Sequence, residues 1–192
     1  MGKIFCLMGK SGSGKDTIYS RLLEDADLDL SRIIPYTTRP VRAGETEGRE
    51  YHFITPEELK EYRSGGRVIE ERCYHTVHGD WYYATIDDGS LDLAHRNYLM
   101  IGTPEAYLNM RDYFSEGTLV PVYIEVEDGL RLTRALERER SQQEPKYREM
   151  CRRFLADSED FSEERLEEAG IGRRFVNNDL DTCLREIKEY LN

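Results

Sequence analysis

The stretch "LMGKSGSGKDT", residues 7–17, decides the fold of this chain. Gly9, Gly14 and Lys15 fit the pattern G-x-x-x-x-G-K, in which glycines let backbone N–H groups curl around phosphate oxygens and the lysine ammonium meets the outer phosphates. A strand-like run, "KIFCLM", precedes the loop, and a helical pattern of apolar residues follows it. The sequence therefore predicts a strand, a phosphate-binding loop and a helix in succession.

Asp16 departs from this pattern, because such loops place Ser or Thr after the lysine to hold magnesium. A carboxylate is itself a good magnesium ligand, but it repels phosphate when no metal is bound. We therefore expect a triphosphate site that depends strongly on metal, with Asp16 as the metal ligand. The residues expected to hold the triphosphate are Gly9, Lys10, Ser11, Gly12, Ser13, Gly14, Lys15, Asp16 and Thr17.

Length and charge limit the remaining possibilities. With 192 residues, 39% of them hydrophobic and 34% charged, the chain fits one globular domain. A net charge of −11 argues against nucleic acid or an anionic membrane as a partner, since both are bound mainly through surplus Lys and Arg. The sequence carries no signal for an oligomeric state.

The cysteines and histidines give no metal or disulfide pattern. No C-x-x-C pair occurs, so we expect reduced thiols in a cytoplasmic protein and no zinc site. The scattered residues are Cys6, Cys73, Cys151, Cys183, His52, His75, His78 and His95.

The pattern along the chain changes several times. Residues 33–86 are rich in Tyr, Thr, Arg and Gly, with short strand candidates and one helix opened by "TPEEL", which indicates an inserted small lobe. Strand and helix patterns then alternate through "NYLMIG", "PEAYLNMRDYF" and "LVPVYIEV", as expected for a parallel sheet covered by helices on both faces. Residues 128–158 predict a charged helical pair broken near 141–145. A last strand and helix follow, the helix capped by Asn178 or Asp179.

The stretch "PYTTRPVRAGETEGREYHF", residues 35–53, carries a second phosphate signal. Arg39 and Arg42 lie three residues apart in a glycine-containing loop, and Tyr51 follows. Guanidinium groups pair bidentately with phosphate oxygens and a phenol adds a hydrogen bond, so these residues are suited to grip a monophosphate.

This order of residues resembles the guanylate kinase family, whose members carry T-T-R-x-x-R-x-G-E-x-x-G-x-x-Y-x-F at this distance from the phosphate loop. The resemblance covers nearly the whole chain, down to the closing "VNNDLD". It implies an α/β, P-loop three-layer fold with a parallel sheet core, a small mixed lobe that binds the nucleoside monophosphate, and a helical lid. We expect a single domain over residues 1–192, whose parts are a core (1–32, 87–127 and 155–192), a lobe (33–86) and a lid (128–154).

The resemblance also implies the reaction. Members transfer the terminal phosphoryl group of ATP, held with Mg²⁺, to GMP or dGMP, giving ADP and the diphosphate. By position, Arg39, Arg42, Tyr51 and Tyr83 would hold the acceptor phosphate, and Thr85 would keep a hydroxyl near the base. Either Glu70 or Glu71 would read the guanine, because a carboxylate accepts hydrogen bonds from N1–H and the 2-amino group. Lid arginines would neutralise the transferring phosphates.

The site candidates implied by the resemblance form two further sets. For catalysis they are Lys15, Arg39, Arg140 and Arg153. For the lid and the ATP site they are Arg138, Arg140, Arg152, Arg153 and Asn178, although helical arginines commonly pair with neighbouring Glu residues instead.

Three departures from the family concern the base and the metal. Pro35 stands in place of a serine that contacts the base, and the segment from Glu70 to Tyr83 is longer. The strand end that reads Asp-Ile-Asp in the family is here Ile101-Gly102-Thr103, with Thr103 left as a candidate substrate contact. Unless Glu105 reaches back from the next helix, both carboxylates are missing. We therefore hypothesise that the metal-binding carboxylate has moved from position 101 to position 16.

Two alternatives remain open. The same chemistry on another nucleoside monophosphate is one, since the Gly-Ser-Gly-Lys-Asp-Thr loop also resembles loops of deoxynucleoside monophosphate kinases and phosphomevalonate kinases. A non-catalytic module that binds phosphorylated peptides is the other, as in guanylate kinase-like domains of scaffold proteins. Such modules typically lose the phosphate loop, which this sequence keeps.

Overall fold

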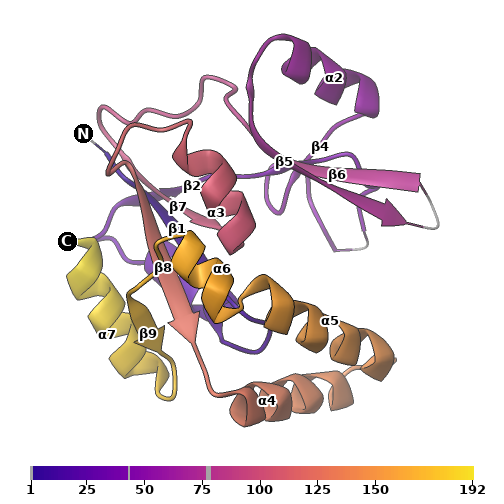
Figure 1. Cartoon of the computed structure of the whole chain (residues 1–192), viewed down its shortest axis with the longest axis vertical. Coiled ribbons are helices and arrows are strands. Elements are labelled where there is room, and N and C mark those ends of the chain that lie inside the picture. The colour runs from indigo at the N-terminus through magenta and orange to yellow at the C-terminus, as the bar shows by residue number, and fades with distance from the viewer. Residues whose placement is uncertain (1, 43, 77–78) are drawn as a thin grey trace.

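A parallel sheet forms the centre of the molecule. The computed structural model describes residues 2–42, 44–76 and 79–192. Five parallel strands lie in the order β2-β7-β1-β8-β9 (Figure 1). Their bounds are β1 Ile4–Gly9, β2 Leu30–Arg32, β7 Asn97–Ile101, β8 Leu119–Glu125 and β9 Arg174–Val176. This confirms the predicted parallel sheet, whose carboxyl edge collects the loops that follow the strands.

Helices cover both faces of this sheet and make a three-layer fold. Alternate residues of β1 enter opposite cores: Ile4, Cys6 and Met8 pack on the side of α3 and α6, whereas Phe5 and Leu7 pack on the side of α1 and α7. Each such fully buried side chain contributes roughly 1.5–3 kcal/mol. The helices are α1 Lys15–Leu23, α3 Pro104–Arg111, α6 Glu163–Glu168 and α7 Leu180–Leu191.

A smaller mixed sheet forms a separate lobe at one side of the core (Figure 1). Its strand order is β4-β3-β6-β5, and a long antiparallel hairpin of β5 and β6 projects from it. The bounds are β3 Tyr36–Thr37, β4 His52–Phe53, β5 Val68–Thr76, β6 Gly79–Ile86 and α2 Pro56–Ser64. Thr55 and Glu58 form a capping box that starts α2, as "TPEEL" predicts.

Two antiparallel helices follow β8, where the charged pair was predicted. They are α4 Asp128–Arg140 and α5 Tyr147–Asp160, and they pack against each other below the carboxyl end of β8 (Figure 1). α5 is continuous through residue 154, where the sequence places the end of the lid. The predicted boundary between the lid and the core, after residue 154, therefore falls within one continuous helix.

Several short helices and strands were not predicted from the sequence. β2, β3 and α6 have three, two and six residues, too few to produce a clear hydrophobic period. At the last helix the structure selects one of two predicted caps, because the Asp179 side chain accepts a hydrogen bond from the Thr182 N–H. Among the described residues, no helix has the length and apolar character needed to cross a membrane.

Candidate active site

The glycine-rich loop joins β1 to α1 in a conformation that needs glycine. Gly12 and Gly14 have φ angles of 83° and 82°, in the left-handed region that other residues rarely adopt. A Cβ on Gly12 would lie 2.7 Å from the carbonyl oxygen of Arg131, which is backbone and cannot move aside easily. The loop therefore has both the curvature and the close packing of a phosphate cradle.

Side chains from three distant elements hold this loop. The Ser11 N–H donates to Asp157 Oδ2 at 2.6 Å, and Arg131 Nη1 donates to the Ser11 carbonyl at 2.9 Å. Arg153 Nη2 lies 3.1 Å from Ser11 Oγ, and Asn177 Nδ2 donates to the Ser13 carbonyl at 2.7 Å. Helices α4 and α5 are thus tied directly to the loop.

A cleft of about 850 Å³ runs from the loop into the small lobe. It brings together most of the predicted site residues, which lie far apart in the sequence. Those that line it are Gly9, Ser11, Lys15, Asp16, Pro35, Arg42, Tyr51, Glu70, Tyr83, Thr85, Thr103, Arg152 and Arg153. The two phosphate signals of the sequence therefore face one cleft.

The structure separates the two carboxylates that the sequence offers as base contacts. Glu70 is 5% exposed, lines the cleft and accepts a hydrogen bond from Thr85 Oγ1 at 3.0 Å. Glu71 lies on the other face of β5, where Arg63 binds it through two hydrogen bonds of 2.7 and 2.8 Å. The carboxylate available to a base is therefore Glu70.

Arg72 lines the same cleft as Glu70 and was not predicted. Its Nε lies 3.3 Å from Glu70 Oε2, yet among the described residues neither of these buried atoms has a hydrogen-bond partner. Burial raises the pKa of Glu70, and Arg72 opposes this shift. The pair thus brings an acceptor and a donor, both with unused hydrogen-bonding capacity, into the same part of the cleft.

The residues predicted to bind the acceptor phosphate fall into two groups, those that line the cleft and one that is buried outside it. Arg42, Tyr51 and Tyr83 line the cleft. Arg39 instead is 3% exposed, does not line it, and holds Glu45 with contacts of 2.7 and 2.5 Å. Its guanidinium lies 4.9 Å from the centre of the Tyr51 ring, and this contact fixes the ring from behind.

The four candidate lid arginines separate in the same way. Of these, only Arg152 and Arg153 line the cleft in the described part of the chain. Arg152 is held by Glu149 at 2.6 Å, whereas Arg153 touches the loop. Arg138 and Arg140 are exposed on α4. Of these four candidates, Arg153 is the one with a hydrogen bond to the loop.

Asp16 and Ile101 do border the same cleft, as the hypothesis of a moved carboxylate requires. The Asp16 side chain is 77% exposed, with Oδ1 3.5 Å from Lys15 Nζ. Ile101 pairs with Leu7 of β1 and is 37% exposed. Glu105 is exposed, is not among the residues that line the cleft, and acts electrostatically on Glu70 and Arg72. Asp16 is thus a carboxylate that lies beside Lys15 in this cleft.

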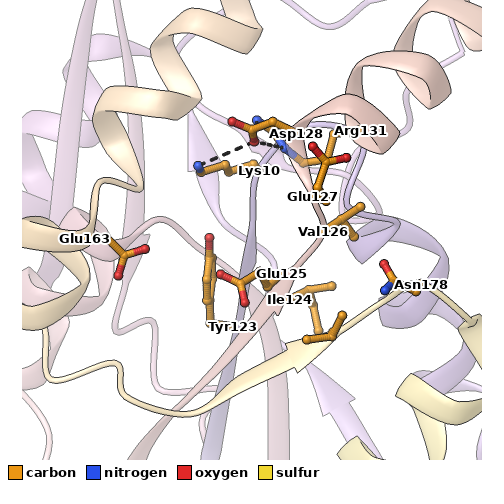
Figure 2. Close-up of a pocket in the computed structure, with 11 residues that line it drawn as sticks. Lys10, Tyr123, Ile124, Glu125, Val126, Glu127, Asp128, Arg131, Glu163 and Asn178 are labelled. Atoms are coloured by element: carbon orange, nitrogen blue, oxygen red, sulfur yellow. Dashed lines mark hydrogen bonds and ion pairs between the residues drawn. The ribbon is translucent and has the colours of Figure 1, made fainter.

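A second cavity, of about 360 Å³, lies between Lys10 and the carboxyl end of β8 (Figure 2). Lys10 reaches into it and meets Asp128 at 4.0 Å, and the predicted Asn178 lines its far side. Its acidic residues outnumber its basic ones, which suits an uncharged group rather than a phosphate. The charged lining residues are Lys10, Glu125, Glu127, Asp128, Arg131 and Glu163.

Several residues of the site gave no recognisable sequence signal. Arg72, Arg49, Arg131 and Asp157 all touch the cleft or the loop. Arg131 is fully buried, bound to Asp128 at 2.7 Å. In the sequence these residues sit among many helical or loop charges, and only the three-dimensional arrangement distinguishes them from solvated ones.

Comparison with known proteins gives a consistent result. The guanylate kinase family model matches residues 1–102. The chain is 28% identical to a guanylate kinase of Porphyromonas gingivalis over 98% of this chain and 96% of that protein. It is 29% identical to one of Salinibacter ruber over 98% and 97%. The crystal structure of guanylate kinase from Anaplasma phagocytophilum shares the fold, with a TM-score of 0.64 and 22% identity over 99% of this chain and 84% of that one. Since the family model spans more than half of the chain, this protein belongs to the guanylate kinase family.

Proposed function

We propose that this chain transfers the γ-phosphoryl group of ATP to GMP or dGMP and releases ADP and the diphosphate. The observation that carries the proposal is one cleft that contains both the phosphate loop with Lys15 and the buried carboxylate Glu70. Phosphoryl transfer needs positioning and charge neutralisation more than covalent chemistry, and such a cleft provides both.

The residues around the loop would hold the donor. Loop N–H groups and the start of α1 bind the triphosphate, and Lys15 neutralises its outer phosphates. Arg153, already at the loop, adds positive charge where the transferred group leaves. Asn178 lines the second cavity, across from Lys10, and its amide is suited to contact the uncharged donor base.

Magnesium fits this site through Asp16. Mg²⁺ is commonly held by one or two carboxylates together with substrate phosphates and water, and Asp16 offers an exposed carboxylate beside the loop. When bound, the ion would supply charge neutralisation between the outer phosphates. We expect Asp16→Ala to weaken magnesium-dependent ATP binding by at least about tenfold. Asp16→Ser should not restore it, because Ile101 supplies no second carboxylate. Calorimetric titration of ATP with and without magnesium measures both effects, and unchanged binding by Asp16→Ala would contradict this role.

The acceptor would lie between the small lobe and the core. Arg42, Tyr51 and Tyr83 face its phosphate, and Arg39 supports Tyr51 from behind. Glu70 accepts from the guanine N1–H and 2-amino group. Arg72 donates toward the O6/N7 edge, a pairing that arginine makes well with guanine. This donor would compensate for Pro35, which offers no hydrogen bond.

The proposed lobe (33–86) and lid (128–154) would close over the two nucleotides, as expected for phosphoryl transfer away from water. The four cysteines are free thiols, which fits a reducing compartment, and we propose the cytoplasm.

The deciding experiment is a panel of acceptors with coupled detection of ADP, with magnesium and with manganese. We expect GMP and dGMP to be turned over, and IMP more weakly because it lacks the 2-amino group. Preference for a different monophosphate would support the alternative kinase. ATP binding without turnover of any acceptor would favour the phosphopeptide-binding module.

A further inference from the structure

The β5–β6 hairpin has two chemically different faces. Its strands pair in register, with Cys73 opposite Tyr82 and His75 opposite Asp80. Side chains alternate along a strand, so the residues at the even positions of β5 form the face that lines the nucleotide cleft. That inner face includes Glu70, Arg72, Tyr74, Thr76, Trp81, Tyr83 and Thr85. Cys73, His75 and Asp80 fall on the outer face.

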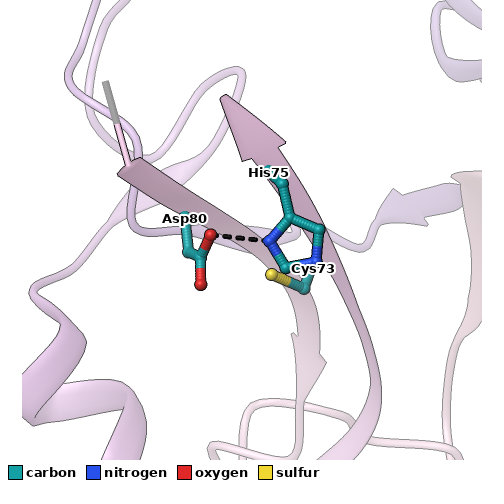
Figure 3. A group of neighbouring side chains, drawn as sticks. All are labelled: Cys73, His75 and Asp80. Atoms are coloured by element: carbon teal, nitrogen blue, oxygen red, sulfur yellow. Dashed lines mark hydrogen bonds and ion pairs between the residues drawn. The ribbon is translucent and has the colours of Figure 1, made fainter. Parts of the chain in front are cut away.

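The outer face gathers three possible metal ligands near the end of the hairpin. One donor atom from each of Cys73, His75 and Asp80 lies within 4.8 Å of the other two. Figure 3 shows the three side chains converging from the two strands, with His75 Nδ1 2.7 Å from Asp80 Oδ1. The sequence predicted no metal site here, because the histidine spacing reveals neither the strand pairing nor the shared face. His78, also considered there, lies outside the described residues.

The chemistry of this set selects a particular class of ion. Zinc takes cysteine sulfur, histidine nitrogen and carboxylate oxygen in a tetrahedron, and three protein ligands leave its fourth position to water. Magnesium and calcium prefer oxygen alone. A tetrahedral zinc ion at about 2.0–2.3 Å from its ligands would place them roughly 3.5 Å apart. The observed separations, 2.7 Å between His75 Nδ1 and Asp80 Oδ1 and at most 4.8 Å within the group, bracket that spacing, and all three side chains are exposed.

We propose that Cys73, His75 and Asp80 form a site for zinc or a similar borderline-soft divalent cation, separate from the magnesium site of the phosphoryl transfer. The ion would bind the Cys73 thiolate, and the thiol proton would pass to solvent. It would tie β5 to β6 directly behind Tyr74 and Trp81, and so stiffen one wall of the cleft from outside. This hairpin belongs to the segment in which the chain is longer than the family pattern.

The test uses the full-length protein, reduced and freed of metal, with magnesium in excess. Cobalt(II) is titrated first, because a thiolate ligand gives it a charge-transfer absorption, and zinc is then added to displace it. Cys73→Ser, His75→Ala and Asp80→Asn are compared with Cys151→Ser, which removes the other exposed thiol. We expect one equivalent of cobalt with the thiolate absorption in the unmodified protein and in Cys151→Ser. The absorption should be lost in Cys73→Ser, and affinity should fall at least about tenfold in the other two.

A second readout does not depend on colour. Zinc should slow alkylation of Cys73 by iodoacetamide and leave Cys151 unaffected, as followed by mass spectrometry of the two peptides. Circular dichroism of each variant checks that the fold is kept. The proposal is overturned if cobalt gives no thiolate absorption in the unmodified protein, if Cys73→Ser retains it, or if zinc protects both thiols equally.

Discussion

Arg72→Met offers the sharpest test of how the cleft reads a base. The substitution keeps an unbranched apolar stem, although a shorter one, and removes the charge from beside Glu70. In the proposed mechanism Glu70 must be ionised to accept two hydrogen bonds from guanine. Burial already raises the pKa of Glu70, and Arg72 is the cation that restrains this rise.

The size of the effect follows from the separation of the two groups. At 3.3 Å and an effective dielectric constant of about 20, the attraction is roughly 5 kcal/mol. Water and salt in the open cleft screen part of it, so we expect a net loss of about 2 kcal/mol, or roughly 30-fold in kcat/KM for GMP at neutral pH. The sign of the pH effect is also fixed. Without Arg72 the carboxyl protonates at higher pH, so the acidic limb of the kcat/KM profile should move upward.

The assay is a pH series of kcat/KM for GMP, with Arg63→Met as the matched control. Arg63 makes the equivalent ion pair with Glu71 on the outer face of the same strand, so its loss should leave the profile in place. 7-Deaza-GMP, which lacks N7, should lose less from Arg72→Met than GMP does. An unmoved acidic limb, or an equal effect of Arg63→Met, would refute the role given to Arg72. Absence of GMP turnover in the unmodified enzyme would instead refute the proposed function itself.

The remaining predictions concern the scaffold of the site. Arg39 lowers the pKa of Glu45 to about 2, so Glu45→Gln should reduce stability by about 2 kcal/mol at neutral pH. In urea unfolding the difference from the unmodified protein should shrink as pH falls from about 4.5 toward 2, and a pH-independent difference would contradict the pairing. Arg131→Met removes a fully buried guanidinium, so the free energy of unfolding should fall by about 3 kcal/mol and Tm by roughly 6–12 °C in calorimetry. A decrease below about 1 kcal/mol would show that the buried ion pair contributes little to stability. Gly12→Ala should weaken ATP binding and lower stability more than Gly66→Ala does. Both glycines have a positive φ, but only a Cβ at position 12 would clash with backbone. Equal effects of the two substitutions would contradict a role for the close packing of the loop.

The phosphate loop could be predicted from sequence because its signal is local. Glycines at fixed spacing, a strand before and a helix after define the same structure wherever they occur. The choice between Glu70 and Glu71 is not local, since a shift of one residue in register exchanges the two faces of a strand. Here the register of β5 shifts between Val68 and Glu70, and no feature of the sequence predicts this shift. The pairing of Glu70 with Thr85 places Glu70 on the cleft face of the strand.

The helical arginines illustrate a second limit. Which of them face the cleft depends on how α4 and α5 are rotated against the loop, and that rotation is set by packing. Arg131 is buried under Ser11, and Arg138, two turns further along the same helix, is in solvent. Both look alike in a run of charged residues. The resemblance to a family could indicate which helical region carries the arginines of the site, but it could not identify which arginines those are.

The hydrogen bond from Ser11 to Asp157 gives the loop an anionic partner from within the protein. In the structure a carboxylate oxygen from α5 accepts the amide hydrogen that a phosphate oxygen would take. In the proposed function, a phosphate oxygen of ATP would compete with this carboxylate for the Ser11 N–H. Because Asp157 belongs to α5, ATP bound in this way would release one of the attachments of α5 to the loop, and competition for a single N–H group would link the donor site to the proposed lid.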